Sequence, residues 1–310
     1  MKVSIIGGGG RVGSNAAFAL QLGGIVREIV INDMNAELAE GEALDLRHGS
    51  ALTSSQIIRS GDYSAIDGSD CVVITAGLRR KPDESRLELI NRNVTLFKDI
   101  IGNVKNLKLP ETATILVVSN PVDILTQLAV EESGLPESQI FGLGTVLDTC
   151  RFRSLLADHF KVGATDIDAV ILGEHGDSMV PIWSSATIGG VHLSSLPGFT
   201  QAVGDGIFDA TKKSGASVIS LKGGAGWAVG VSIKEVVEAV ALDSERILPV
   251  SSLQKGVMGI SGVCLSLPTR VGRKGVVSVL EPAVSDAERS ALLASRDALK
   301  SVWDQVSAPA

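Results

Sequence analysis

The glycine-rich stretch at residues 7–13 constrains the fold of this chain more than any other feature. It follows a short β-branched run at residues 2–6 and precedes an apolar, alanine-rich run at residues 16–22. This order predicts a strand, a tight turn and a helix. The glycines satisfy both G-x-G-x-x-G and G-x-x-G-x-x-G, and such a turn lets backbone N–H groups at a helix N-terminus approach a pyrophosphate. The stretch therefore predicts a dinucleotide-binding turn.

The end of the next apolar run strengthens this prediction. Residues 28–31 are followed by Asn32 and Asp33, about 20 residues beyond the last glycine, as the dinucleotide fingerprint requires. We expect the Asp33 carboxylate to accept hydrogen bonds from ribose hydroxyls and to repel a 2′-phosphate, which favours NAD over NADP. Arg11 and Asn32 leave NADP open. The alternative is a plain glycine turn with an aspartate that caps a helix.

Further apolar runs continue an alternation of strands and helices. Residues 70–75 and 114–118 are expected to form buried strands of a parallel sheet, and residues 140–144 its last strand. We therefore predict an α/β protein with an N-terminal Rossmann domain, a doubly wound parallel sheet, at residues 1–145. Residues 146–310 are expected to form an α+β substrate domain, in which runs between residues 246 and 280 suggest an antiparallel sheet.

Composition excludes several classes of protein. The net charge of −7 argues against a nucleic-acid partner, whose phosphates are bound largely by clustered Lys and Arg. No apolar run reaches the roughly 20 residues that a membrane span needs, and residue 1 leads directly into the first strand. The three cysteines are widely spaced and fit neither a disulfide framework nor a zinc site. We expect a cytoplasmic protein without a membrane partner and without a bound metal.

The stretch Gly173-Glu174-His175-Gly176-Asp177 is the strongest candidate for a catalytic group. It follows the apolar run 169–172, and strand ends are common places for chemistry. A neutral imidazole can take a proton from an alcohol and return it to a carbonyl near neutral pH, and a carboxylate fixes its tautomer. The alternative for a lone histidine is an ordinary turn residue with no chemical role.

Two more stretches carry groups suited to an anionic substrate. The loop at residues 78–86 contains Arg79, Arg80, Lys81 and Arg86, which are either a solvated charge run or a lid that closes over an anion. Asn120 follows the strand at 114–118, where its amide could contact a substrate or simply cap the next helix.

Asp148 and Arg151 are three residues apart in a predicted helix, so they lie on one face. They could form an ordinary surface ion pair, which is worth little. Alternatively, Asp148 pairs with His175, and Arg151 holds a substrate carboxylate in bidentate geometry.

The motifs of this chain together resemble those of the lactate/malate dehydrogenase family, in the expected order and across essentially the whole chain. The resemblance implies that His175 donates and accepts the proton and that Asp148 is its partner. It also implies that Arg151 clamps the substrate's C1 carboxylate and that Arg86 polarises the reacting C–O bond. The motifs are the glycine loop, Ser119-Asn120-Pro121-Val122-Asp123, the segment from Gly144 to Arg153, and Gly173-Glu174-His175-Gly176-Asp177.

The same resemblance completes the set of candidate site residues. It implies Asn120 as a substrate contact and Asn93 as a contact on the nicotinamide side. The candidate substrate-binding residues are Arg80, Arg86, Asn120 and Arg151. The candidate cofactor-binding residues are Gly7, Gly8, Gly10, Arg11, Val12, Gly13, Asp33, Asn93, Val118 and Asn120.

Two positions suggest a substrate within the family. Family members that act on lactate have Gln where this chain has Arg80, and a second carboxylate needs a buried cation. Ala225 stands where lactate enzymes usually have Thr, which leaves room for a longer substrate. These residues predict a dicarboxylate substrate and a malate dehydrogenase of the tricarboxylic acid cycle, although the motif around His175 resembles the lactate branch. L-lactate or another 2-hydroxy acid is the alternative.

Hypotheses from other classes stay open at this point. A dinucleotide-dependent glycosidase would need a metal site that Cys150 and His175 do not obviously supply. A non-catalytic NAD sensor would keep the glycine loop but would not need Asp148, Arg151 and His175 together. We expect a homodimer or homotetramer, and the sequence does not distinguish the two.

Overall fold

The computed structural model describes residues 1–78 and 83–307, and its main sheet has eight strands in the order β12-β11-β6-β5-β4-β1-β2-β3. Strands β6 through β3 in this order are parallel to their neighbours, as predicted for the first half. This half contains β1 (Lys2–Ile6), α1 (Arg11–Gly23), β2 (Glu28–Asn32), α2 (Ala36–Gly49), β3 (Ile57–Ser60), β4 (Cys71–Ile74), α3 (Arg86–Val104), β5 (Thr114–Val117), α4 (Val122–Glu132) and β6 (Ile140–Gly142).

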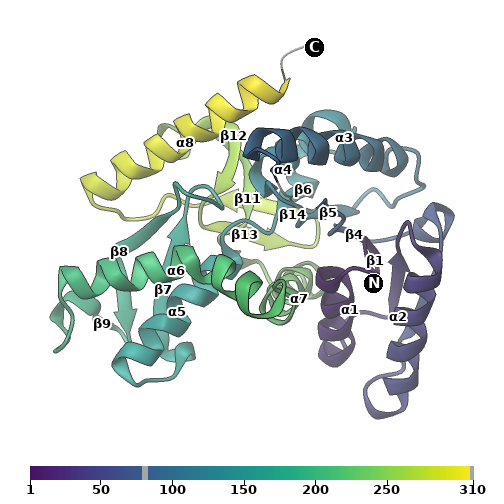
Figure 1. Ribbon diagram of the computed structural model, residues 1–310, viewed down its shortest axis with the longest axis horizontal. Helices are drawn as coiled ribbons and strands as arrows, with labels where there is room; N and C mark the ends of the chain where they lie inside the picture. The colour runs from purple at the N-terminus through teal and green to yellow at the C-terminus, as the bar shows by residue number, and fades with distance from the viewer. Residues whose placement is uncertain (79–82, 308–310) are drawn as a thin grey trace.

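The second half adds helices, two smaller sheets and two strands of the main sheet. Figure 1 shows helix α8 along the upper left of the molecule, with α1 and α2 at the lower right. The elements are α5 (Val146–Phe160), β7 (Ile167–Leu172), β8 (Val180–Ile188), β9 (Val191–His192), α6 (Gln201–Lys222), α7 (Trp227–Leu242), β10 (Arg246–Leu248), β11 (Ser251–Lys255), β12 (Ser261–Ser266), β13 (Thr269–Gly272), β14 (Gly275–Val279) and α8 (Asp286–Ser307).

The parallel strands are buried on both faces because their side chains alternate between two cores. Ile5 and Val73 belong to the core under α1, α2 and α7. Ile6 and Ile74, one residue further along each strand, belong to the core under α3 and α4. These helices therefore cover both faces, which confirms the predicted doubly wound α/β architecture.

The antiparallel strands of the second half differ from the prediction in two ways. Strands β11 and β12 pair antiparallel and join the edge of the parallel sheet through β6. Residues 257–259, within the span 246–280 for which an antiparallel sheet was predicted, form a 3-10 turn, where the N-cap residue Gly256 and Met258 adopt positive φ values of 114° and 57°. Since strands of the second half complete the sheet of the first, the division at residue 145 stays a prediction.

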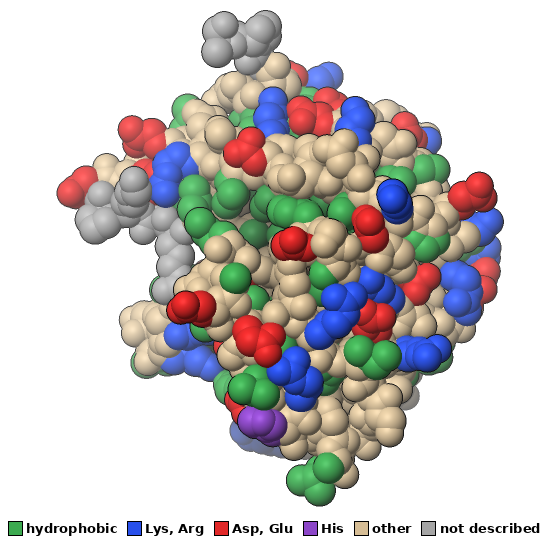
Figure 2. All heavy atoms as spheres, turned by 90° about the vertical axis from the view of Figure 1, so that its right-hand side faces the viewer, with side chains coloured by type: hydrophobic (Ala, Val, Ile, Leu, Met, Phe, Trp, Pro, Cys, Tyr) green, Lys and Arg blue, Asp and Glu red, His purple; other side chains and the backbone are tan. Residues whose placement is uncertain are grey.

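The charged side chains on the surface agree with the inference from composition, which argued against a nucleic-acid partner. On the face shown in Figure 2, acidic and basic side chains are interspersed, without a field of one sign that would suit a polyanion. Across residues 1–78 and 83–307, no helix combines the length and apolar character that a membrane span requires. The three cysteines are all free.

Candidate active site

The turn between β1 and α1 is closed by backbone contacts that only glycine permits. The N–H groups of Gly7 and Gly8 both donate to the Asn32 carbonyl at 2.9 Å. Gly7 has a φ of +83°. A Cβ on Gly13 would lie 2.5 Å from the Gly7 oxygen and 2.6 Å from the Gly8 Cα. The turn thus holds α1 tightly against β1, with the N-terminus of α1 at the end of the strand.

Asp33 faces this turn from the end of β2. Its Oδ2 accepts from the Gly9 N–H at 3.1 Å and its Oδ1 accepts from the Asn35 N–H at 3.0 Å. Asn35, not Asp33, caps α2 by accepting from the Leu38 N–H at 3.1 Å. The helix-cap interpretation of Asp33 is therefore wrong, and its binding of ribose hydroxyls stays a prediction.

The N-terminus of α1 fits a pyrophosphate. The first N–H groups of this helix, those of Arg11, Val12 and Gly13, have no intrahelical acceptor, and within the described residues no side chain caps them. Cβ atoms at Gly7, Gly8 and Gly13 would collide with neighbouring protein atoms, so glycine lets this turn pack closely against the start of the helix. This cradle and the Asp33 carboxylate fit NAD.

Arg11 connects the two halves of the chain. Its Nη1 donates to the carbonyl of Lys222 at 2.7 Å and to that of Gly224 at 2.9 Å. Ala225 follows directly, in the turn between α6 and α7. The Arg11 side chain therefore holds this turn beside the glycine loop, and its direct contact with a cofactor stays a prediction.

Three further candidate residues lie on two elements: Val118 and Asn120 follow β5, and Asn93 lies in α3. Val118 continues β5, where its N–H donates to the Ile74 carbonyl at 2.9 Å. Asn120 is exposed and precedes Pro121 through a cis peptide bond. Asn93 is 4% exposed, and its Oδ1 accepts from the Leu78 N–H at 2.8 Å. Asn93 therefore fixes the start of the loop that follows β4.

His175 and Asp148 meet in the second half, as the sequence predicted. The His175 Nδ1 lies 2.5 Å from the Asp148 Oδ2, and the Asp148 side chain is only 1% exposed. The contact forms because the start of α5 is pinned to β7: the Thr145 hydroxyl donates to the Ile171 carbonyl at 2.5 Å. The His175 side chain keeps 23% of its surface exposed, so its other ring nitrogen can reach a bound molecule.

Arg151 binds the other oxygen of the same carboxylate. Its Nη1 donates to Asp148 Oδ1 at 3.0 Å, and 18% of the Arg151 side chain is exposed. This i,i+3 contact differs from an ordinary surface ion pair, because Asp148 is buried. The structure therefore brings His175, Asp148 and Arg151 together.

Electrostatics in this cluster favour an ionised acid beside a protonated base. Burial by itself raises the pKa of Asp148, but the charges and hydrogen bonds of His175 and Arg151 outweigh burial and hold that pKa below its usual value. Burial lowers the pKa of His175, whereas the charge and hydrogen bond of Asp148 raise it more. The pKa of His175 is therefore raised above its ordinary value. A raised pKa suits a residue that donates a proton near neutral pH.

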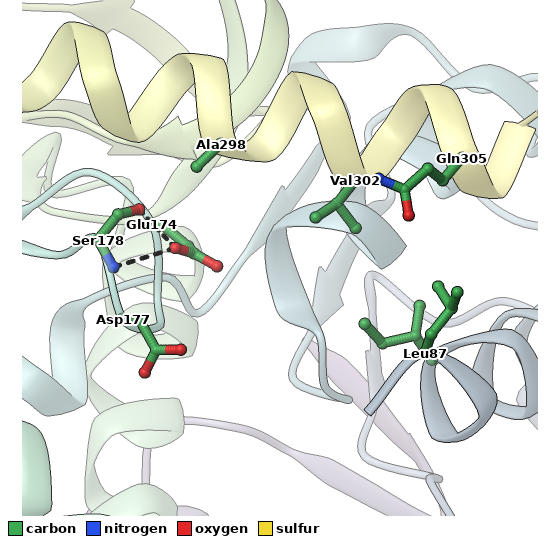
Figure 3. A pocket seen from close by; sticks show the side chains of 8 residues that line it. Leu87, Glu174, Asp177, Ser178, Ala298, Val302 and Gln305 are labelled. Atoms are coloured by element: carbon green, nitrogen blue, oxygen red, sulfur yellow. Dashed lines mark hydrogen bonds between the residues drawn. The ribbon is translucent and has the colours of Figure 1, made fainter. Parts of the chain in front are cut away.

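We call residues 173–177, which follow β7 and contain His175, the catalytic loop. A cavity of about 480 Å³ opens beside Glu174 of this loop, between the start of α3 and helix α8. In Figure 3, Ala298 and Val302 project from α8 toward it, and Leu87 faces them from α3. The Glu174 carboxylate at its edge accepts from the Ser178 hydroxyl at 2.5 Å. The cavity borders the loop without including the His175 ring.

The remaining candidates carry no described side chain. Arg79, Arg80 and Lys81 lie outside the described residues. Arg86 begins α3, behind the capping residue Ser85, but its side chain is also outside the described part. Their roles as a lid, a specificity cation and a polarising group stay predictions. Among the residues that the structure describes, no group of His, Cys, Asp and Glu could hold a metal ion.

Comparisons with known proteins agree with this geometry. The NAD-binding domain of lactate/malate dehydrogenase matches residues 1–142, and the α/β C-terminal domain of the same enzymes matches residues 145–309. The chain belongs to the lactate/malate dehydrogenase family. This assignment confirms the predicted family, the predicted fold class and the predicted cofactor, NAD, and it sets aside the glycosidase hypothesis.

Individual relatives of this dehydrogenase carry a more specific name. L-lactate dehydrogenase 1 of Clostridium acetobutylicum is 44% identical over 310 residues, with 98% of each chain covered. L-lactate dehydrogenase of Thermoanaerobacter sp. strain X514 is 42% identical and covers 98% of this chain and 99% of its own. The structure of the minor L-lactate dehydrogenase of Enterococcus mundtii has a TM-score of 0.95, 34% identity and 99% coverage of both chains.

These relatives contradict the predicted malate dehydrogenase. That prediction depended on two positions, Arg80 and Ala225, whereas the similarity to enzymes named L-lactate dehydrogenase extends over 98% of the chain. A single cation determines substrate only if its side chain reaches the substrate, and Arg80 lies outside the described residues. The malate assignment, the dicarboxylate substrate derived from it and the place in the tricarboxylic acid cycle are therefore not supported.

The structure of this dehydrogenase also shows two contacts of the catalytic loop that sequence analysis missed. The Asp123 carboxylate accepts from the His175 N–H at 2.8 Å, and the Ser295 hydroxyl accepts from the Glu174 N–H at 2.9 Å. Asp123 lies in a motif noted in the sequence, where an acid in the first turn of a helix looks like a response to the helix dipole. Ser295 offered no signal, because a serine within a long helix has no distinctive pattern.

Proposed function

We propose that this chain is an NAD-dependent L-lactate dehydrogenase that interconverts pyruvate and L-lactate. The observation that carries the proposal is the 2.5 Å contact between His175 Nδ1 and the buried Asp148 carboxylate, which also binds Arg151. It supplies a proton donor and a cation for a carboxylate in one place. The names of the relatives support pyruvate and L-lactate as the substrate pair.

The proposed mechanism assigns a task to each of these side chains. When bound, NADH supplies the hydride that adds to C2 of pyruvate. The protonated His175 donates its Nε2 proton to the C2 oxygen, because its Nδ1 faces Asp148. Asp148 stays ionised and stabilises the imidazolium. Arg151 holds the substrate carboxylate, so that the carbonyl oxygen faces the imidazole.

Roles that depend on the family resemblance are part of the same proposal. Arg86 polarises the C–O bond and Asn120 contacts the substrate. Arg80 stays a candidate substrate-binding residue, with no dicarboxylate assigned to it. The proposed cofactor-binding residues are Gly7, Gly8, Gly10, Arg11, Val12, Gly13, Asp33, Asn93, Val118 and Asn120.

Assembly and location complete the proposal. We propose a homodimer or homotetramer, in the cytoplasm, with domains at residues 1–145 and 146–310. Large apolar side chains exposed on α1 and α7 support an assembly, since an isolated chain would leave them in water. These side chains are Phe18, Leu22, Trp227 and Val231, which are between 43% and 65% exposed.

A steady-state comparison of pyruvate and oxaloacetate, each with NADH, tests the function. We expect kcat/KM for pyruvate to exceed that for oxaloacetate by about tenfold or more. Fresh oxaloacetate is needed because it decarboxylates to pyruvate, and the products are identified as lactate or malate.

Two outcomes of this comparison contradict the proposal. A higher kcat/KM for oxaloacetate, with malate as the product, would overturn lactate as the substrate. NADH binding without oxidation by either acid would favour the non-catalytic sensor.

A further inference from the structure

Two buried side chains from different elements hold adjacent N–H groups of the catalytic loop. Ser295 of α8 accepts from the Glu174 N–H at 2.9 Å, and Asp123 of α4 accepts from the His175 N–H at 2.8 Å. Ser295 is fully buried and Asp123 is 2% exposed. The two contacts are equivalent in geometry, but only Asp123 can carry a charge.

Asp123 is poorly solvated for a carboxyl group. Burial raises the pKa of Asp123 to about 6. The neighbouring Ser251 side chain and the His175 N–H lower this pKa, but burial outweighs them, and the Oδ1 atom makes no hydrogen bond of ordinary geometry within the described residues. A serine or an amide would accept the His175 N–H without the cost of burying a charge, so a purely structural role does not explain a carboxylate here.

We propose that Asp123 is a positioning residue for His175 and that its negative charge stabilises the imidazolium form of the ring. His175 would then have two carboxylates from two helices, Asp148 of α5 at the ring and Asp123 of α4 at the backbone. The inference rests on the proposed function, in which a protonated His175 is the donor.

The other charged and titratable groups around His175 leave room for this effect. From α5, Asp148 favours the protonated ring and Arg151 opposes it. In the loop itself, Glu174 is hydrogen bonded to Ser178. Cys264 of β12 is near Asp123, but burial raises the pKa of its thiol well above the usual value, so it stays neutral. The charge of Asp123 raises the pKa of His175 and thereby opposes the lowering of that pKa by Arg151.

The test compares Asp123→Asn with Ser295→Ala through the pH dependence of kcat/KM for pyruvate reduction. The Asn side chain keeps an oxygen acceptor for the His175 N–H but removes the charge. We expect the apparent pKa of the essential acid to fall by about 0.5 to 1 unit in Asp123→Asn. Ser295→Ala disturbs the neighbouring N–H without removing a charge, so it should lower the rate without moving that pKa.

A second readout does not need turnover. Acylation of His175 by diethyl pyrocarbonate requires the neutral ring, and His175→Asn identifies which of the four histidines gives the signal. The pH dependence of the His175 acylation rate should shift to lower pH in Asp123→Asn, as expected for the pKa from kcat/KM. If Asp123→Asn does not fold, Asp123→Ser, which keeps a hydroxyl acceptor without a charge, should give the same shift.

The two proposals fail in different ways. Unchanged pH profiles in a folded, active Asp123→Asn or Asp123→Ser variant would overturn the role of the Asp123 charge and leave the proposed function intact. A wild-type protein that binds NADH but does not reduce pyruvate would overturn the function, and the acylation profile would still report on Asp123.

Discussion

Replacing His175 by Asn should lower kcat for pyruvate reduction by about 10³-fold, because the ring is the proposed proton donor to the C2 oxygen. Asparagine can donate a hydrogen bond from its amide, but it cannot release a proton near neutral pH. Binding of NADH should change little, since the glycine loop and Asp33 lie on other elements. Steady-state rates and fluorescence titration with NADH measure the two effects separately.

His159→Asn is a matched control for this variant. His159 is exposed near the end of α5 and its Nε2 lies 3.2 Å from the Gly198 carbonyl, so its replacement should leave kcat within about twofold of wild type. If His175→Asn retained more than about a tenth of the wild-type kcat, another group would have to supply the proton.

Asp148→Asn should lower kcat/KM for pyruvate by about 10² to 10³-fold. The amide can still accept from the His175 ring, but the charge that stabilises the imidazolium is lost. Without it the pKa of His175 falls, so less of the enzyme carries the proton at neutral pH. The decline of the reduction rate with rising pH should therefore begin at a lower pH, which rate profiles across the neutral range would measure.

The pair Arg153 and Asp168 provides the control for Asp148→Asn. Arg153 Nη2 lies 3.2 Å from Asp168 Oδ1, but the Asp168 side chain is 86% exposed. Asp168→Asn removes an ion pair of the same kind where solvent screens it, so it should leave kcat/KM nearly unchanged. If kcat/KM of the Asp148→Asn enzyme stayed within threefold of the wild-type value, the charge of this buried carboxylate would have no role in catalysis.

The cofactor half could be predicted from the sequence because its signals are local. The glycine turn and Asp33 are about 20 residues apart, and the strand and helix between them fix their geometry. The contact between Asp148 and His175 joins positions 27 residues apart, and the sequence alone left it open against a surface ion pair until the family resemblance favoured it. The structure explains it through the bonds that tie the start of α5 to β7.

Other features depend on packing that no local pattern encodes. An antiparallel sheet was predicted between residues 246 and 280, where β11 and β12 lie, but their place at the edge of the main sheet comes from the pairing of β11 with β6, more than 100 residues away along the chain. The support that Asp123 gives to His175 crosses 52 residues. The malate prediction was wrong for a related reason. It depended on the identities of Arg80 and Ala225 alone, whereas the surroundings of a side chain decide whether it contacts the substrate.

The pH dependence of kcat/KM in both directions tests the central claim most directly. With pyruvate and NADH, the value should be constant at low pH and fall as pH rises through the pKa of His175, which lies above its ordinary 6.5. With L-lactate and NAD, it should rise through the same pKa, because the neutral ring must accept the proton. Profiles that are flat across this range, or that change in the same direction for both reactions, would contradict the assignment of His175 as the acid and base.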